Sequence, residues 1–257
     1  MASIINFFTI IGSIATAVSA AIACITLQSL KKQRESTYKP DIVLEPLNFY
    51  IYSIIKSDLP YPCEWSKEDK GFDYNTTSFN NFIQAELHNL GLGAARYISA
   101  RYDFDMIESM RLTKAEMMKL KEDLRVMTVI DQKRLEVIPA SESSPFQKMF
   151  YAPLGHVYKL NHILPDSVAK DSIQLPVISQ YLFFISLSVY LMWATPQPIK
   201  NTGVSKMKLI DLPPLFLVLT YFDIANKEYN KKFELRFSLL TSSKIKTQGV
   251  LNVKEIG

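Results

Sequence analysis

The side chains that most often perform catalysis are few and scattered in this chain. The three histidines are His88, His156 and His162, and none of them stands in a His-Glu-x-x-His pattern. Neither cysteine, Cys24 or Cys63, belongs to a Cys-x-x-Cys pair, so a zinc site has no ligand set of the usual spacing. No Gly-x-Ser-x-Gly nucleophile elbow is present either. The sequence therefore predicts a protein that is not an enzyme and that uses no metal or cofactor, with histidines in structural or surface positions.

A glycine pair, Gly91-Leu92-Gly93, raises the question of a phosphate-binding loop. The pair lacks the third glycine of the dinucleotide fingerprint, and no Gly-Lys-Ser or Gly-Lys-Thr follows it. Glycine also serves where a turn or a bulge joins two strands. We expect a turn between strands here, not a nucleotide site.

Basic side chains gather in the last quarter of the chain, close to aromatic residues. The candidate ligand-binding residues are Lys206, Lys208, Lys231, Lys232, Arg236, Lys244 and Lys246. Lysines beside aromatic rings such as Tyr221 and Tyr229 can hold a phosphate backbone or stack a base. The same lysines also fit a solvated sheet face or attraction to anionic inner-leaflet lipid. The net charge of +4 is small for a nucleic-acid reader, so both interpretations stay open.

The chain begins with a segment that carries no charged residue. The chain has 29 basic and 25 acidic residues, and none lies in the first thirty positions. As a helix, residues 4–30 would extend about 40 Å, against a hydrocarbon core of about 30 Å. A cleaved signal peptide is the alternative, but it needs a basic region before the apolar run. The cluster Lys31-Lys32-Gln33-Arg34 follows the run and predicts that the amino terminus lies outside and the remainder in the cytoplasm.

The predicted span has two dissimilar faces. Its small or hydroxylated residues, spaced by three and four, are Thr9, Gly12, Thr16, Ser19, Ala23 and Thr26. The opposite face carries only isoleucine and valine and suits lipid. Small residues let helices approach closely, so this face predicts packing against copies of itself or against a partner helix. The second interpretation is that several copies line a narrow hydrated pore.

The rest of the chain reads as mainly β. Strand patterns occupy 41–55 and 79–89, and residues 89–104 predict a glycine-containing turn or bulge that leads into a second strand. A capping box at Thr113–Glu116, followed by Met117, Leu120, Leu124 and Met127 at helical spacing, predicts one inserted helix of about four turns. Residues 177–193 are uncharged over 17 positions and predict a buried strand, with a second membrane span as the alternative. Residues 215–222 and 229–240 predict a hairpin. The resulting organisation is a transmembrane helix at 4–30, a basic juxtamembrane connector at 31–40 and a cytoplasmic β-sandwich domain at 41–257.

Two short motifs in this layout support a resemblance. The strand junction from Asn89 to Ala95 and the hairpin segment Tyr221-Phe222-Asp223 resemble elements of bacterial proteins that join a membrane helix to an immunoglobulin-like β-sandwich. The junction departs from that pattern, because alanines stand at 94 and 95 where a proline is expected. The whole layout is similar to transmembrane effectors of bacterial anti-phage defence, in particular the Hailong-type effector. That resemblance implies an inner-membrane channel held closed by a DNA oligomer, which a partner nucleotidyltransferase-like protein makes.

Two classes of function follow from the sequence. The first is an oligomeric membrane effector, gated by a ligand or partner bound to the cytoplasmic domain, that depolarises the membrane. The second is a passive membrane anchor or scaffold that recruits a cytoplasmic partner protein. Both predict the membrane as a partner, and the first also predicts a homo-oligomer.

Overall fold

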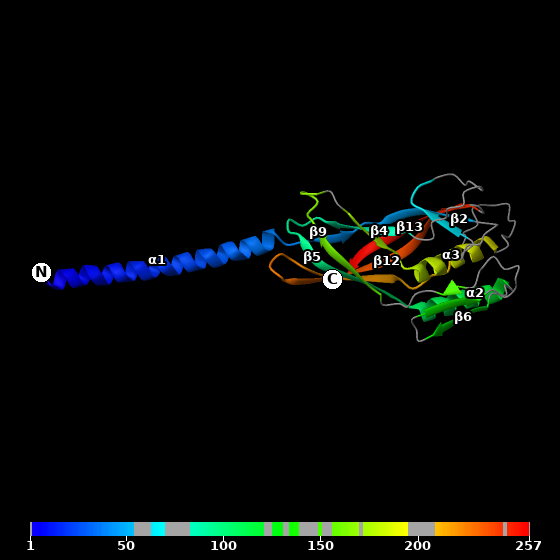
Figure 1. Cartoon of the computed structure of the whole chain (residues 1–257), viewed down its shortest axis with the longest axis horizontal. Helices are drawn as coiled ribbons and strands as arrows, with labels where there is room; N and C mark the ends of the chain where they lie inside the picture. Colours follow the sequence, from blue (N-terminus) through cyan, green and yellow to red (C-terminus); the bar gives the residue numbers. More distant parts are fainter. Residues whose placement is uncertain are drawn as a thin grey trace, which may run out of the picture.

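The computed structural model describes residues 2–53, 63–69, 83–120, 125–130, 134–138, 149–150, 156–169, 172–194, 209–243 and 246–256. These residues form a mainly β domain with a long helix projecting from one end (Figure 1).

The projecting helix α1 spans Ala2–Thr37. Within its described side chains, Ile14–Arg34 is long and apolar enough to cross a membrane, and none of that stretch is buried against the rest of the chain. Its apolar side chains, including Ile14, Ile22 and Ile25, are about half exposed or more. The helix continues through the predicted basic connector and ends one turn before Pro40, in agreement with the restriction that proline places on the preceding backbone.

The largest sheet is antiparallel, has seven strands and curls around the core. Its strand order is β3-β2-β13-β12-β11-β5-β9. The strands are β2 (Leu47–Ser53), β3 (Cys63–Ser66), β5 (Ala95–Phe104), β9 (Val157–Ile163), β11 (Leu215–Phe222), β12 (Glu228–Ser242) and β13 (Lys246–Ile256). On β11, buried and partly exposed residues alternate along the whole strand, so one face of the sheet packs on the core.

Two smaller sheets and a second helix accompany the large sheet. The order β1-β4-β10 joins β1 (Ile42–Leu44), β4 (Gln84–Asn89) and β10 (Ile173–Pro176). The order β6-β7-β8 joins β6 (Arg125–Ile130), β7 (Arg134–Ile138) and β8 (Met149–Phe150). The second helix, α2, spans Met106–Leu120.

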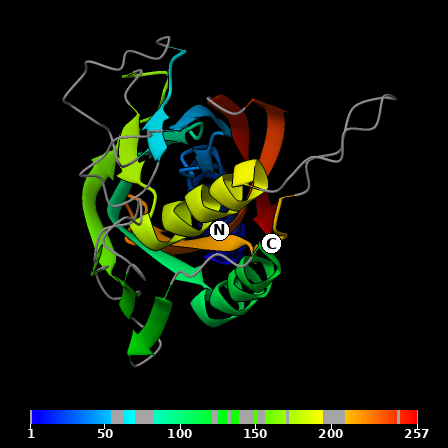
Figure 2. The same ribbon diagram turned by 90° about the vertical axis from the view of Figure 1, so that its right-hand side faces the viewer.

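The predicted strand at 177–193 is wrong, because this segment forms helix α3, Ser179–Ala194. Figure 2 shows α3 in the middle of the molecule, with strands around it. Phe183, Phe184 and Leu187 are fully buried, so the helix lacks the lipid-exposed surface of a second span. A helix that is apolar on every side has no amphipathic period, which is why its sequence resembled a buried strand.

Several buried polar groups of α3 have partners inside the domain. Ser186 accepts a hydrogen bond from the indole N–H of Trp65 at 3.1 Å, and Ser188 accepts one from the backbone N–H of Ile210 at 3.0 Å. The hydroxyl of Tyr181 donates to the carbonyl of Leu235 at 3.4 Å. Buried polar groups without partners are costly, so these bonds fix the position of α3 against the sheet.

The predicted capping box at Thr113–Glu116 is also wrong, and the inserted helix is present but lies nearer the amino terminus than predicted. Met127, which was expected in this helix, belongs instead to strand β6. Helix α2 begins at Met106, where the carboxylate of Asp105 accepts the backbone N–H of Glu108 at 2.9 Å. Thr113 lies inside the helix and donates to the carbonyl of Ser109 at 2.7 Å. The described domain thus contains two helices, α2 and α3, where the sequence predicted one.

The predicted hairpin is confirmed with small shifts of its ends. Strands β11 and β12 pair from Leu215 opposite Leu235 to Phe222 opposite Glu228. Strand β13, which the sequence analysis did not identify, continues the sheet and pairs with both β12 and β2. Its alternation is interrupted by exposed polar residues at its carboxyl end, which weakened the strand pattern.

Candidate functional site at the junction of the helix and the β domain

The residues that join α1 to the β domain form a site with many hydrogen bonds. The backbone N–H of Tyr38 still bonds to the carbonyl of Arg34 at 2.9 Å, so helical geometry persists to the edge of the domain. Pro40 is buried and Asp41 leads directly into β1, whose first residue, Ile42, is fully buried. The helix is therefore joined to the core by the short connector 38–41 and not by a long loop.

Asn89 is the central residue of this junction. Its side chain is fully buried at the end of β4. The amide oxygen accepts the backbone N–H of Asp41 at 3.0 Å and that of Gly91 at 3.1 Å. The amide nitrogen donates to the carbonyls of Gly93 at 2.8 Å and Ile163 at 3.2 Å. One side chain thus joins the end of the helix connector to the β4–β5 turn and to β9.

The two glycines of the β4–β5 turn are required by close contact with the connector. A side chain on Gly91 would lie 2.3 Å from the carbonyl oxygen of Lys39, and one on Gly93 would lie 1.8 Å from that of Tyr38. Neither distance leaves room for a methyl group. The prediction of a turn between strands is confirmed, and its physical reason is the backbone of the α1 connector.

A lysine ties the same connector to the central sheet. Lys231 of β12 bonds to the carboxylate of Asp41 at 2.6 Å and to that of Glu255 at 2.9 Å, and its side chain is only 13% exposed. Burial lowers the pKa of Lys231, but its hydrogen bonds to Asp41 and Glu255 outweigh burial and leave the pKa raised. The lysine is therefore positively charged at neutral pH and holds two carboxylates together.

The β11–β12 turn reaches the connector as well. Asp223 is buried and its carboxylate accepts the backbone N–H groups of Ala225 at 2.8 Å and Lys227 at 2.9 Å. Its other oxygen accepts the hydroxyl of Tyr229 at 3.1 Å. The ammonium group of Lys39 lies 5.5 Å from the centre of the Tyr229 ring, within range of a cation–π interaction. Both motifs of the sequence resemblance, at Asn89 and at Asp223, thus shape the same junction.

The small-residue face of α1, predicted to pack against another helix or to line a pore, has no contact with the β domain at its described side chains. Gly12, Thr16, Ser19, Ala23 and Thr26 are all exposed, whereas the side chain of Thr9 lies outside the described residues. The hydroxyl of Thr16 donates to the carbonyl of Gly12 at 2.8 Å, and that of Thr26 donates to the carbonyl of Ile22 at 2.9 Å. Both hydroxyl protons are satisfied within the helix, so an apolar surrounding does not leave them unpaired.

The structure does not gather the predicted basic residues into one described patch. Lys206, Lys208 and Lys244 lie outside the described residues. Lys231 points inward at the junction, whereas Lys232 lies on the outer face of the sheet with its ammonium 4.1 Å from the centre of the Phe216 ring. Arg236, also on the outer face, pairs with Glu234.

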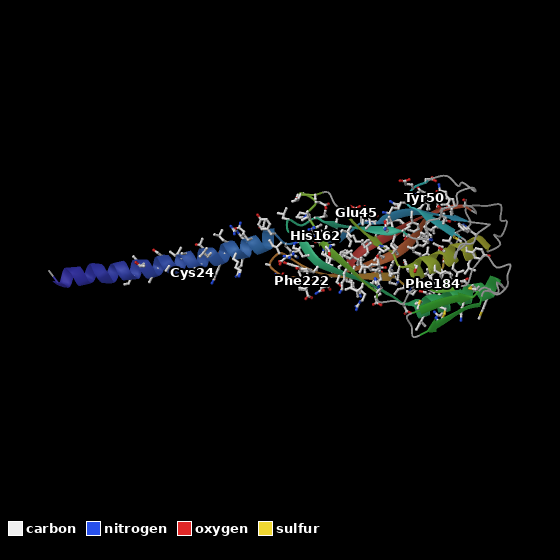
Figure 3. All side chains as sticks on the ribbon, viewed as in Figure 1. Cys24, Glu45, Tyr50, His162, Phe184 and Phe222 are labelled. Carbon is white, nitrogen blue, oxygen red and sulfur yellow. The ribbon has the colours of Figure 1, made fainter. Side chains whose placement is uncertain are left out.

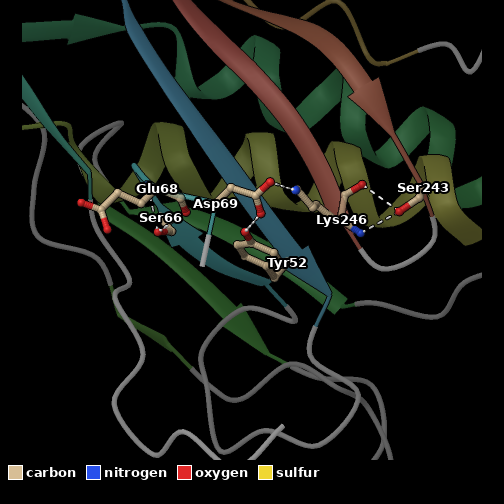
Figure 4. A network of polar contacts seen from close by, with 6 residues as sticks. All are labelled: Tyr52, Ser66, Glu68, Asp69, Ser243 and Lys246. Carbon is tan, nitrogen blue, oxygen red and sulfur yellow. Dashed lines mark hydrogen bonds and ion pairs between the residues drawn. The ribbon is translucent and has the colours of Figure 1, made fainter. Parts of the chain in front are cut away.

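Lys246 lies at the end of the sheet far from α1. It pairs with Asp69, whose carboxylate also accepts the hydroxyl of Tyr52 at 3.1 Å (Figure 4). The backbone N–H of Lys246 donates to the hydroxyl of Ser243 at 3.1 Å and closes the β12–β13 turn. This network stabilises a turn, and its lysine is already neutralised by a carboxylate.

The histidines and cavities of the described residues show no catalytic arrangement. His88 lies near three carboxylates, with its Nδ1 3.6 Å from Asp166 and its Nε2 3.8 Å from Glu45 and 3.9 Å from Glu86. Among the residues that the structure describes, no group of three or more histidine, cysteine or acidic residues could hold a metal ion.

A cavity of about 390 Å³ lies between α2 and α3, lined mainly by apolar residues such as Leu112 and Leu191.

No family model, curated protein or solved structure matches this chain.

Proposed function

We propose that this protein is an oligomeric membrane effector in which α1 spans the membrane and the β domain controls how the spans associate. In this proposal several copies of α1 pack through the small-residue face and make the membrane permeable to ions. The β domain, an immunoglobulin-like element on the cytoplasmic side of a bacterial inner membrane, transmits the binding of a ligand or partner to the helices.

The observation that carries the proposal is the hydrogen-bonded junction at Asn89. A passive anchor needs only a flexible tether between its span and its folded domain. Here the helix runs to Thr37, and the connector is then bonded to three separate parts of the domain through Asn89, Lys231 and Tyr229. Movement within the β domain would therefore be passed to the helix, as gating requires.

The two faces of α1 support association within a membrane. Lipid offers no hydrophobic gain for helix pairing, so close backbone approach at small residues is the main source of affinity. Gly12 has no neighbour within 4 Å of the position that a side chain would take, so its face is free for another helix. Ile14, Val18 and Ile22 lie on the opposite face and suit the acyl chains.

The DNA-oligomer ligand and its nucleotidyltransferase-like maker remain predictions from the resemblance. Of the predicted basic residues that are described, Lys231, Arg236 and Lys246 pair with carboxylates, which reduces the charge available for phosphates. Nucleic acid that co-purifies with the chain at low salt would support this ligand, and its absence would contradict it.

The proposal is tested by expressing the full chain in bacteria and measuring membrane potential with a fluorescent dye. We expect the wild-type chain to depolarise the cells and the double variant Thr16→Leu, Ser19→Leu to leave the potential intact. The matched control is Ile14→Leu, Val18→Leu, which changes the opposite face and should still depolarise. A normal potential with the wild-type chain at a membrane level equal to that of the variants would favour the passive anchor.

A further inference from the structure

The end of the β domain that faces α1 exposes a set of apolar side chains. They come from the β4–β5 turn, the start of β5, the loop after β9 and the β11–β12 turn. The exposed members are Leu90, Leu92, Tyr97, Val168 and Ile224, each at least half exposed to solvent. Phe222 joins them, because its ring centre lies 6.5 Å from that of Tyr97. We call these six residues the apolar rim.

The apolar rim surrounds the point where α1 enters the domain. The β4–β5 turn contacts Tyr38 and Lys39 directly, and the β11–β12 turn reaches Lys39 through Tyr229. The loop after β9 is held by a hydrogen bond of 2.9 Å from the backbone N–H of Asp166 to the carbonyl of Asn89. Figure 3 shows Phe222 and His162 at the end of the domain beside α1, with Phe184 deep in the interior.

The backbone at Tyr97 is distorted in a way that places this ring on the rim. Its φ of 51° is unusual for a bulky aromatic residue. Where β5 pairs with β9, Tyr97 has no partner residue on β9. Its ring is 62% exposed. The guanidinium of Arg96 lies 5.1 Å from the ring centre and donates to its hydroxyl at 3.2 Å. The ring is thus held outward, with a positive charge beside it.

The length of α1 brings the rim close to the lipid headgroups. The charge-free run of α1 ends at Leu30, and the eight residues from there to Tyr38 rise about 12 Å along the helix axis. The charge-free run is about 40 Å long against a hydrocarbon core of about 30 Å, so α1 has room to tilt, and a tilt brings the rim nearer to the headgroups. The headgroup region on each side of the hydrocarbon core is about 5–7 Å thick. Aromatic and aliphatic side chains at this depth, together with basic residues, are typical of a membrane interface.

The charges around the rim match an anionic membrane surface. Lys31, Lys32 and Arg34 lie on the last turns of α1, and Lys39 and Lys227 lie on the connector and on the β11–β12 turn. Asp223 of this turn is buried beneath backbone N–H groups, and Asp41 of the connector is paired with Lys231. Asp166 and the exposed Glu228 also lie near the rim, and they are outnumbered by the basic side chains. Positive charge therefore faces the same direction as the apolar rim, as binding to anionic lipid requires.

We infer that the apolar rim docks on the inner-leaflet surface of the bilayer that α1 spans, with anionic lipid as its partner. This inference rests on the proposed membrane span, because only the span brings the rim to the bilayer. Docking at several loops fixes the orientation of the β domain relative to the membrane. A movement within the domain then displaces α1, because the domain as a whole cannot shift on the membrane surface.

The inference is tested with fluorescent labels on the full chain in vesicles of phosphatidylethanolamine and phosphatidylglycerol. Leu92→Cys and Ile224→Cys, each in a Cys24→Ser, Cys63→Ser background, receive a polarity-sensitive dye in detergent before reconstitution. The matched control is Leu240→Cys, because Leu240 is similarly exposed, at 52%, but lies near the opposite end of β12. We expect blue-shifted emission and quenching by spin-labelled lipid at positions 92 and 224, and neither at position 240.

A label on Cys24, in a Cys63→Ser chain, separates this inference from the proposed function. Cys24 lies within the candidate span and is exposed. If Cys24 is quenched while positions 92 and 224 behave like 240, the span holds and the docking of the rim is refuted. If Cys24 is not quenched either, both the span and the docking are refuted.

Discussion

Replacing Asn89 by alanine should destabilise the β domain, because it removes the side chain that joins three parts of the junction. The change removes four hydrogen bonds, two accepted from the backbone N–H groups of Asp41 and Gly91 and two donated to the carbonyls of Gly93 and Ile163. Each such bond contributes about 0.5–1.5 kcal/mol net, which gives about 2–6 kcal/mol for the set. Water can reach the partly exposed Asp41 and Gly91, so we expect the lower half of that range, about 2–4 kcal/mol.

The free energy of unfolding is measured by urea titration of the full chain in detergent micelles, followed by the fluorescence of its two tryptophans, the buried Trp65 and the partly buried Trp193. The matched control is Asn230→Ala. Asn230 also accepts one hydrogen bond, from Thr220, and donates one, to Glu228, but it is exposed on the sheet surface. This control should change stability by about 0.5 kcal/mol or less. If Asn89→Ala lies as close to wild type as the control does, the reasoning on the junction is refuted.

Three further results are expected from the same unfolding assay. Ser186→Ala should cost about 1–3 kcal/mol, because the indole N–H of Trp65 would stay buried without its partner at 3.1 Å; an unchanged midpoint would contradict this. Gly93→Ala should destabilise the domain strongly, because its methyl group would overlap the carbonyl of Tyr38, and an alanine chain as stable as wild type would refute the close contact. Lys231→Met should lower stability by about 1 kcal/mol at neutral pH. Because the folded pKa of Lys231 is raised above 10.5, the difference from wild type should stay constant from neutral pH to about pH 10.5 and shrink as pH rises through the folded pKa; a difference that shrinks near neutral pH would contradict the assignment.

The sequence predicted local elements well where their periodicity was clear. The apolar helix before Pro40, the glycine turn at Gly91 and the β11–β12 hairpin are all present in the structure. The segment at 177–193 was predicted as a strand because uniform burial removes the period that distinguishes a helix from a strand. The start of α2 was misplaced because Thr113 lies inside the helix and donates its hydroxyl to the carbonyl of Ser109 instead of capping.

The junction itself could not be predicted, because its bonds join residues far apart in the chain. Asn89 was part of a quoted motif, but its bond to the backbone of Asp41 depends on how β1 pairs with β4. Lys231 was assigned to ligand binding from its neighbours in sequence. Its two carboxylate partners, Asp41 and Glu255, come from the connector and from β13, which only the folded sheet brings together.

Loss of membrane potential in vesicles that contain only the purified full chain tests the central claim most directly. The account predicts that the ligand-free wild-type chain dissipates an imposed potassium potential, because packed α1 helices make the membrane permeable. It also predicts that Thr16→Leu, Ser19→Leu preserves the potential at equal protein content. A potential that persists with the wild-type chain, or one that both chains dissipate equally, would contradict the claim that the small-residue face of α1 makes the membrane permeable.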